Sequence, residues 1–281
     1  MLGILLVTLS ASLVLAPGAM ANLLTLKSGG SPNADSIASL YKITLYIAAV
    51  VFVVVEGALV YSVFRFRAKK SKVAAQIHGN TRLEIGWTVG AALILVVLTV
   101  VTFVKLPSII NPPKSDANGL VLSASLGQPT PPDGKKLTIC VQGRQYIWRY
   151  TYGAGCDQGA FTGKLPYSYQ QMVVPANTTV VLVIQANDVI HSWWIPSLGG
   201  KVDAVPGYTT YTWFKAPHAG ALYHGQCAQL CGRQHAAMTA QVKVVTPSQY
   251  QQFLSQQQSM ISTANAQVTQ LRQVLTANGN L

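Results

Sequence analysis

Four residues that can bind soft metals lie within twelve positions in the last third of the chain: Cys227, Cys231, His235 and Met238. Thiolates and imidazoles bind soft and borderline metals, and a methionine thioether favours copper over zinc or magnesium. His191 lies 36 residues before Cys227, between strand-like segments, and can complete the site from a neighbouring loop. We therefore predict a copper site that carries electrons.

The second cysteine separates this set from a single-copper site, which uses two histidines, one cysteine and a weakly bound methionine. Two bridging thiolates would hold two copper ions close together, each with one histidine as a further ligand. Met238 would serve one copper, and the backbone carbonyl of Gln229, between the cysteines, would serve the other. Sharing one electron over two coppers in a rigid cage keeps reorganisation small, which suits electron transfer rather than bond chemistry.

A C-x-x-x-C pair taken alone is more typical of a disulfide or of a zinc site. The histidines and the methionine at fixed offsets favour copper instead. His218 and His224 lack such a pattern, and we interpret them as surface histidines or neighbours of the site. Cys140 and Cys156 stand apart from the motif. Outside the cytoplasm they would form a disulfide, and the alternative is two buried thiols.

The composition indicates that part of the chain lies in a membrane. Half of its 281 residues are hydrophobic and only 10% are charged, against about 25% in soluble domains. The net charge is +12. The main basic cluster directly follows an apolar run and comprises Arg65, Arg67, Lys69, Lys70 and Lys72. This position is typical of a topogenic signal, so we expect no nucleic-acid partner.

Two apolar runs have the length of about 20 residues that a membrane-spanning helix needs. They predict helices at about 40–66 and 85–106, which form a hairpin over 38–106. Because the loop at 65–84 carries most of the nearby positive charge, we expect it to face the cytoplasm. The rest of the chain then lies on the other side of the membrane.

The remaining segments differ in amino-acid composition. Residues 1–21 are typical of a secretory signal, with a retained hydrophobic segment as the alternative, and residues 22–37 are predicted to be a loop. Between 117 and 246, short runs rich in Val, Ile, Thr and Tyr predict a β-sandwich or barrel. These runs are 137–142, 145–152, 172–174, 179–185, 208–214 and 239–245. The Gln- and Ser-rich tail at 247–281 predicts a weakly amphipathic helix.

From about 38 to 246 the chain resembles subunit II of the haem–copper oxidases, of the cytochrome c oxidase type with a binuclear CuA centre. The motifs are Leu83-Glu84-Ile-Gly-Trp87-Thr88, Asp188-Val-Ile-His191-Ser, Lys201-Val-Asp203-Ala-Val-Pro206-Gly207 and Gly225-Gln-Cys227-Ala-Gln-Leu-Cys231-Gly-x-x-His235-x-x-Met238. The resemblance implies an all-β cupredoxin-like barrel following a two-helix transmembrane hairpin. It also implies the copper ligands His191, Cys227, Gln229 (backbone oxygen), Cys231, His235 and Met238.

The resemblance further implies a function. Electrons would reach CuA from a periplasmic carrier and pass to haem in subunit I, where O2 is reduced to water with proton translocation. The hairpin would pack on subunit I, and subunit III is a further expected partner. The chain itself would hold no haem. We expect it in a bacterial inner membrane with the copper domain in the periplasm.

Two glutamates lie in or beside the apolar runs. Glu84 matches the glutamate that in the family lies at the mouth of a proton path into subunit I. The alternative is an ordinary first-turn residue favoured by the helix dipole. Glu56 lies in the middle of a predicted helix, and we expect it to face protein because burying its charge in lipid is costly.

The chain departs from the family pattern at three aromatic or polar positions. Gln229 replaces a glutamate that also binds magnesium, and since an amide binds a hard cation less well, we expect weaker magnesium binding there. Tyr146 replaces the tryptophan that receives electrons. Tyr146 and Trp148 are therefore our candidates for that role, with core packing as the alternative. Tyr208 replaces an arginine, which removes a polar contact to subunit I.

Charge is a fourth departure. From residue 117 onward the chain has ten basic and four acidic residues, a net charge of +6. The family usually presents an acidic patch that steers a basic cytochrome c. We predict instead a cytochrome c or blue-copper donor that docks through neutral or apolar contacts, or an acidic donor. The scarcity of carboxylates also favours an acidic periplasm, and hence an acidophile, because carboxylates are protonated there.

Three other functions share some of these features. Subunit II of a quinol oxidase has the same fold and hairpin but lacks the copper ligands. Copper-delivery proteins of assembly carry C-x-x-x-C followed by proline on a thioredoxin-like fold, whereas here Gly232 follows Cys231. The CuA domain of nitrous oxide reductase is soluble and fused to a large catalytic domain, and the predicted hairpin argues against it.

Overall fold

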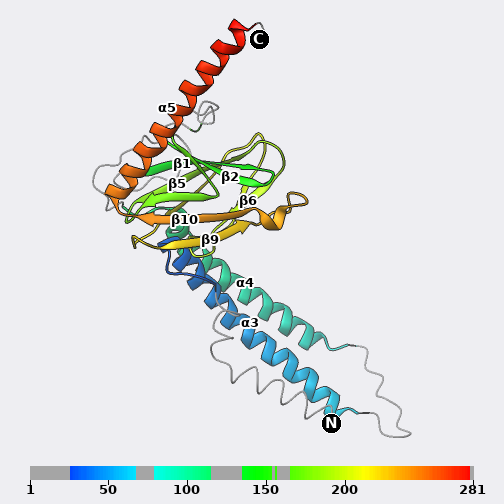
Figure 1. The fold of residues 1–281 in the computed structure, drawn as a ribbon. Coiled ribbons are helices and arrows are strands. Elements are labelled where there is room, and N and C mark those ends of the chain that lie inside the picture. The colour runs from blue at the N-terminus through cyan, green and yellow to red at the C-terminus, as the bar shows by residue number, and fades with distance from the viewer. Residues whose placement is uncertain (1–25, 68–78, 115–134, 154–155, 157–164, 279–281) are drawn as a thin grey trace, which may run out of the picture. The chain divides into compact units, whose positions relative to one another are not determined.

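The computed structural model describes the chain except for residues 1–25, 68–78, 115–134, 154–155, 157–164 and 279–281 (Figure 1). The chain divides into two compact units. One comprises Ala38–Pro107, and the other comprises Met1–Ile37 together with Ser108–Leu281. The signal predicted for residues 1–21 lies outside the described residues.

The first unit contains most of two long helices, α3 (Pro32–Arg65) and α4 (Thr81–Ile110). Both are long and apolar enough to cross a membrane. Their apolar side chains are largely exposed, as Phe52 and Phe103 illustrate. Apolar surface of this extent requires lipid or another membrane protein as its environment.

Both helices extend beyond the apolar runs that predicted them. Helix α3 begins at Pro32, inside the segment 22–37 that we predicted to be a loop. Proline is tolerated in a first helical turn because its missing N–H would have no helical partner there. Helix α4 continues past Pro107 to Ile110. Hydropathy therefore located the membrane-length core of each helix but not its ends.

Two five-stranded sheets form the second unit (Figure 1). The first has the order β3-β2-β1-β5-β8, with β1 Leu137–Arg144, β2 Ile147–Tyr152, β3 Tyr167–Tyr169, β5 Thr179–Ala186 and β8 Thr210–Lys215. The second has the order β4-β10-β9-β6-β7, with β4 Gln171–Pro175, β6 His191–Trp194, β7 Val202–Ala204, β9 Leu222–Cys227 and β10 Thr239–Val245. Their buried side chains form one core that includes Trp148, Leu182, Trp193 and Val242.

This arrangement confirms the predicted fold class of two apolar helices and an all-β domain. Two details were wrong. The strand predicted at 145–152 begins only at Ile147, because Gln145 and Tyr146 form the turn between β1 and β2. Strands β3, β6, β7 and β9 were not among the predicted runs.

The C-terminal helix α5 (Pro247–Ala277) follows β10 directly. Thr246 caps it, since its side chain accepts a hydrogen bond from the Gln249 N–H and the Gln249 side chain accepts one from the Thr246 N–H. At its start Tyr250 is buried and packs with Phe253 against the ring of Tyr152. The predicted tail helix is thus anchored on the β domain through its first turns.

A disulfide joins Cys140 on β1 to Cys156, which follows β2. Of the two alternatives left by the sequence, the bridge is therefore the one in the structure. It ties the start of the segment after β2 to the neighbouring strand. The remaining two cysteines, Cys227 and Cys231, are free thiols.

Candidate metal centre

The pairing of two short strands brings the ligand candidates together. His191 is the first residue of β6 and Cys227 is the last of β9. These strands run antiparallel, with Trp193 opposite Cys227. The chain then leaves β9 in a loop that carries Cys231 and returns through a short 3₁₀ helix, η2 (His235–Ala237), to Met238 and β10. The local motif and the distant histidine therefore meet at one end of the second sheet.

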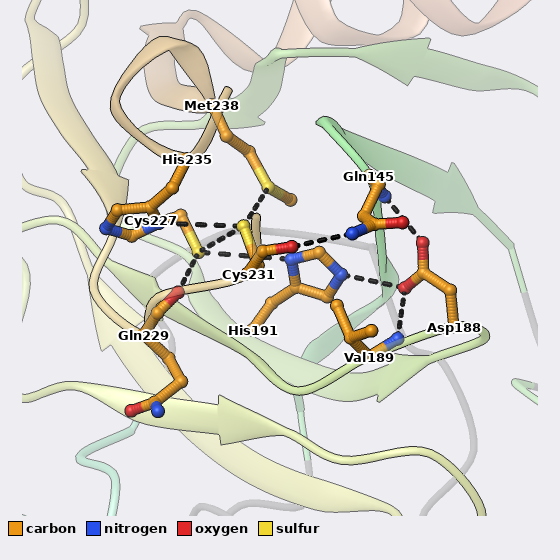
Figure 2. Close-up of polar contacts among 9 residues, drawn as sticks. All are labelled: Gln145, Asp188, Val189, His191, Cys227, Gln229, Cys231, His235 and Met238. Atoms are coloured by element: carbon orange, nitrogen blue, oxygen red, sulfur yellow. Dashed lines mark hydrogen bonds and ion pairs between the residues drawn. The ribbon is translucent and has the colours of Figure 1, made fainter. Parts of the chain in front are cut away.

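Figure 2 shows these donor atoms converging around the two cysteine sulfurs. The sulfurs of Cys227 and Cys231 lie 3.9 Å apart. His191 Nδ1 lies 3.9 Å from Cys227 Sγ, and the Gln229 carbonyl oxygen lies 3.3 Å from the same sulfur. Around Cys231 Sγ, His235 Nδ1 lies at 3.5 Å and Met238 Sδ at 3.9 Å.

Most of the donor set is shielded from water. His191 and Met238 have no exposed surface, and the two cysteines are nearly as deeply buried. His235 is partly exposed, and Gln229 is exposed. The ligand atoms of His191, Cys227 and Cys231 all lie within 4.8 Å of one another, close enough to hold a metal ion.

The electrostatics of the two thiols favour a bound cation. Burial raises the pKa of both. At Cys227, hydrogen bonding to His191 and to main-chain groups outweighs burial, so its pKa is lowered. At Cys231, burial and the neighbouring Cys227 charge raise the pKa. The negative charge of one thiolate thus disfavours ionisation of the other. A positive ion between the two sulfurs would offset this charge repulsion.

Asp188 orients the imidazole of His191. Its Oδ1 lies 2.8 Å from His191 Nε2 and also accepts a hydrogen bond from the Val189 N–H. Burial raises the pKa of Asp188, but the hydrogen bonds, first that from the Gln145 N–H, outweigh it and leave the pKa lowered. A carboxylate that accepts the Nε2 proton leaves the Nδ1 lone pair free to bind metal. Asp188 belongs to one of the sequence motifs, and its position three residues before His191 was a usable signal, but no role was predicted for it.

The tip of the β1–β2 hairpin forms one wall of the site. A Cβ at Gly143 would lie 3.0 Å from His191 Cδ2, so the glycine lets the imidazole lie close to the β1 backbone. The ring of Trp148 meets that of His191 edge-on, with centroids 5.9 Å apart. Tyr146 is partly exposed, whereas Trp148 is completely buried. The burial of Trp148 fits the alternative of core packing, and its role in electron entry stays a prediction.

The other predicted residue, Glu84, lies in the first turn of α4. Its Oε1 accepts a hydrogen bond from the Asn80 N–H at 3.3 Å, while the Asn80 side chain accepts one from the Leu83 N–H. Such a reciprocal pair satisfies two N–H groups that the helix start leaves free. This contact fits the helix-start interpretation and leaves the proton role a prediction.

The donor set as a whole fits copper. Two thiolates, two imidazole nitrogens and a thioether are soft or borderline ligands, and the thioether in particular suits copper better than zinc or a hard cation. The histidine that is most buried has its outer nitrogen held by a carboxylate, as ligating histidines usually do.

Both parts of the chain are similar to known proteins. The family model described as the periplasmic domain of cytochrome c oxidase subunit II matches residues 158–245, and the model of its transmembrane domain matches residues 19–104. A probable cytochrome c oxidase subunit 2 from Rickettsia conorii is 32% identical over 244 residues, covering 82% of this chain and 70% of the relative. The chain belongs to the cytochrome c oxidase subunit II family.

Other family members give similar figures. The cytochrome c oxidase subunit 2 of Thermostichus vulcanus is 34% identical over 269 residues, covering 83% of this chain and 78% of the relative. Among solved structures, the periplasmic domain of subunit II of cytochrome oxidase from Bradyrhizobium japonicum is 28% identical. That match covers 44% of this chain and 95% of the solved one, with a TM-score of 0.39. As a family member, this chain is a membrane-associated part of an oxidoreductase complex.

Proposed function

We propose that this chain is the electron-receiving subunit of a terminal oxidase and that it holds two copper ions between the β6–β9 end and the loop that follows. The observation that carries the proposal is the convergence of two sulfurs, two Nδ1 atoms, a thioether and a carbonyl oxygen. The six residues are His191, Cys227, Gln229, Cys231, His235 and Met238. When bound, the copper pair would accept one electron and pass it on.

The chain's own residues fix the surroundings of that pair. Asp188 favours the His191 tautomer that carries its proton on Nε2, which leaves the Nδ1 lone pair directed toward Cys227 Sγ. Deep burial of the two cysteines and Met238 excludes water from one side. A rigid and largely dry cage keeps the reorganisation on electron transfer small. Subunit II of a quinol oxidase lacks these ligands, so that alternative is not favoured.

An apolar rim around the ligands supports a donor that docks without an acidic patch. Leu230, directly before Cys231, is 77% exposed, and Val189 and Ile190, directly before His191, are 38% and 45% exposed. The charged residues closest in sequence to this rim are Asp188 and Arg233, both exposed, and the Asp188 carboxylate is held by His191 and the Gln145 N–H. We infer that a cytochrome c or a blue-copper protein meets this rim through apolar contacts, with Tyr146 beside them as the electron-receiving aromatic residue.

The helices and their charges support the rest of the assembly. The basic loop at 65–84 favours a cytoplasmic position for that loop, and so a periplasmic position for the β domain in a bacterial inner membrane. The exposed helix surfaces, with Glu56 among them, would pack on subunit I, which holds the haem, and subunit III would join the complex. Glu84 would stand at the mouth of a proton path. The few carboxylates of the β domain favour an acidic periplasm.

Magnesium is a separate part of the proposal. The exposed side chain of Gln229 offers a neutral amide where the family usually has a carboxylate. Because hard cations prefer charged oxygen ligands, we expect weaker magnesium binding at this position than in the family at large. The carbonyl of the same residue, which points at the cysteines, is unaffected by that change.

Metal analysis and electron paramagnetic resonance of the purified oxidase complex test the main proposal. We expect two copper ions per copy of this chain and the spectrum of one unpaired electron shared by both. The variant Cys231→Ser, which removes one bridging sulfur, should lose that spectrum. A wild-type complex that contains no copper in this subunit would contradict the proposal.

A further inference from the structure

Gln145 reaches two sides of the metal centre at once (Figure 2). Its main-chain N–H donates to Asp188 Oδ2 at 2.6 Å, and its side-chain Nε2 donates to the Cys231 carbonyl at 2.7 Å. Asp188 in turn holds His191. One residue at the tip of the β1–β2 hairpin thus connects the segment that carries His191 with the loop that carries Cys231.

The bond to Cys231 acts on the ligand itself. The carbonyl and the sulfur of Cys231 branch from the same Cα, so a fixed carbonyl restricts the directions in which Sγ can point. Cys231 lies in the loop between β9 and η2 rather than in a strand. The backbone of Cys227 is held in place by the pairing of strand β9. The backbone of Cys231 is held instead by the side-chain hydrogen bond from Gln145.

Close packing keeps this loop against the hairpin tip. Gly232 has a φ of +132°, and a Cβ there would lie 2.5 Å from Tyr146 Oη and 2.9 Å from Gln145 Nε2. The positive φ favours glycine, and any larger residue would push the ends of the Tyr146 and Gln145 side chains away. The hydrogen bond from Gln145 is thus part of a fitted contact between the Cys231–Gly232 segment and the turn residues Gln145 and Tyr146.

We propose that Gln145 is a positioning residue that fixes the Cys231 thiolate relative to the His191 imidazole. The inference rests on the proposed copper function, but it concerns a residue that touches no ligand atom of the site. Partners that hold the ligands of a metal typically contribute about 10- to 100-fold in metal affinity. Since Gln145 is itself exposed at the hairpin tip, we expect an effect near the lower end of that range.

Two variants of similar size separate hydrogen bonding from packing. Gln145→Met removes the donor, and Gln145→Glu replaces it with an oxygen that faces the Cys231 carbonyl. Both keep the main-chain N–H to Asp188. The matched control is Gln171→Met, since Gln171 Nε2 makes a comparable bond, to Gln241 Oε1 at 2.9 Å, on strand β4.

The measurements are the rate of copper loss from the purified oxidase complex to a chelator and the copper hyperfine splitting in electron paramagnetic resonance. We expect Gln145→Met to lose copper about 10-fold faster than wild type, with Gln145→Glu faster still, and both to show altered splitting. Gln171→Met should match wild type in both. A merely destabilised domain would not change the splitting of the copper that remains.

The outcomes separate this inference from the function on which it rests. If wild-type complex binds no copper, the proposed function fails. If wild type binds copper and both Gln145 variants retain its loss rate and splitting, the function stands and the positioning role is overturned. An equal effect of Gln171→Met would also overturn the positioning role, because the loss of a glutamine hydrogen bond far from the metal centre would then change the copper site just as much.

Discussion

In the proposed metal centre, Gln229 would contribute through its main chain. Its carbonyl oxygen lies 3.3 Å from Cys227 Sγ, while the residue as a whole is exposed. The conformation of the loop between the cysteines, rather than the amide side chain, places this oxygen. The main chain and the side chain of Cys231 also have separate roles, since its sulfur faces the site while its carbonyl accepts a hydrogen bond from Gln145.

The variant Gln229→Ala should therefore keep its copper. Removing the amide leaves the carbonyl in place, so we expect the copper content per chain to stay within about 20% of wild type and the spectrum to be unchanged, because backbone ligands survive side-chain truncation. Copper analysis of the purified complex checks this, with Cys231→Ser as the variant that should lose the centre. Equal copper loss in both variants would contradict a main-chain role.

At the scale of elements, the antiparallel pairing of β6 and β9 makes the site possible. This pairing sets Trp193 opposite Cys227 and Trp194 opposite Gln226. Gly225 lies at this crossing, and a Cβ there would collide with the main-chain carbonyl of Trp194 and with Ile195. Backbone atoms cannot move aside as a flexible side chain can. The close approach of the two strands therefore requires glycine at this position.

The variant Gly225→Ala should force β6 and β9 apart. We expect the free energy of unfolding of the β domain to fall by about 3 kcal/mol or more, the range of severe overpacking. Urea denaturation of the detergent-solubilised full chain, followed by tryptophan fluorescence, measures it. Gly200→Ala is the matched control, since a Cβ there meets only Ile37 Cδ1 at an ordinary 3.7 Å.

The control should change the free energy of unfolding by less than about 1 kcal/mol, as alanine does where its conformation is allowed. If Gly225→Ala unfolds no more easily than Gly200→Ala, the two strands do not approach as closely as described. Copper content would then be the independent check, because separation of β6 from β9 also moves His191 away from Cys227.

For the whole molecule, charge and exposed apolar surface act together. The chain from residue 117 onward carries a net charge of +6, and the rim beside the ligands exposes Leu230 and Ile190. A basic domain repels a basic donor at long range, and salt screens that repulsion over about 10 Å at 0.1 M. Apolar contact, in contrast, depends little on ionic strength.

Donor oxidation by the intact oxidase should therefore respond weakly to salt. With a blue-copper protein of low net charge, we expect the rate to change less than about 2-fold between 20 and 200 mM salt, because little charge steers the encounter. With a basic cytochrome c, the rate should rise over the same range as repulsion is screened. A steep fall with either donor would contradict docking through the apolar rim.

Much of this protein can be predicted from residues that are close in sequence. The spacing of Cys227, Cys231, His235 and Met238 indicates copper, because one loop can carry four soft or borderline donors to one centre. The two apolar runs indicate the membrane helices because length and hydropathy are local properties. The ends of these helices were predicted less well, since they depend on capping contacts such as those of Asn80 and on the tolerance of Pro32 in a first turn.

The sequence by itself determined the two-part organisation of the chain and predicted the donor types and a copper site. Only the tertiary structure decided what holds the ligands. Strands β6 (His-Ser-Trp-Trp) and β9 (Leu-Tyr-His-Gly-Gln-Cys) lack the runs of Val, Ile and Thr that indicated other strands, so they were not predicted, yet their pairing brings His191 to Cys227. Asp188 and Gln145 meet across 43 positions, and Gln145 reaches Cys231 across 86. Contacts at such separations follow from how the sheets pack, because a local motif does not show which distant residue it will meet.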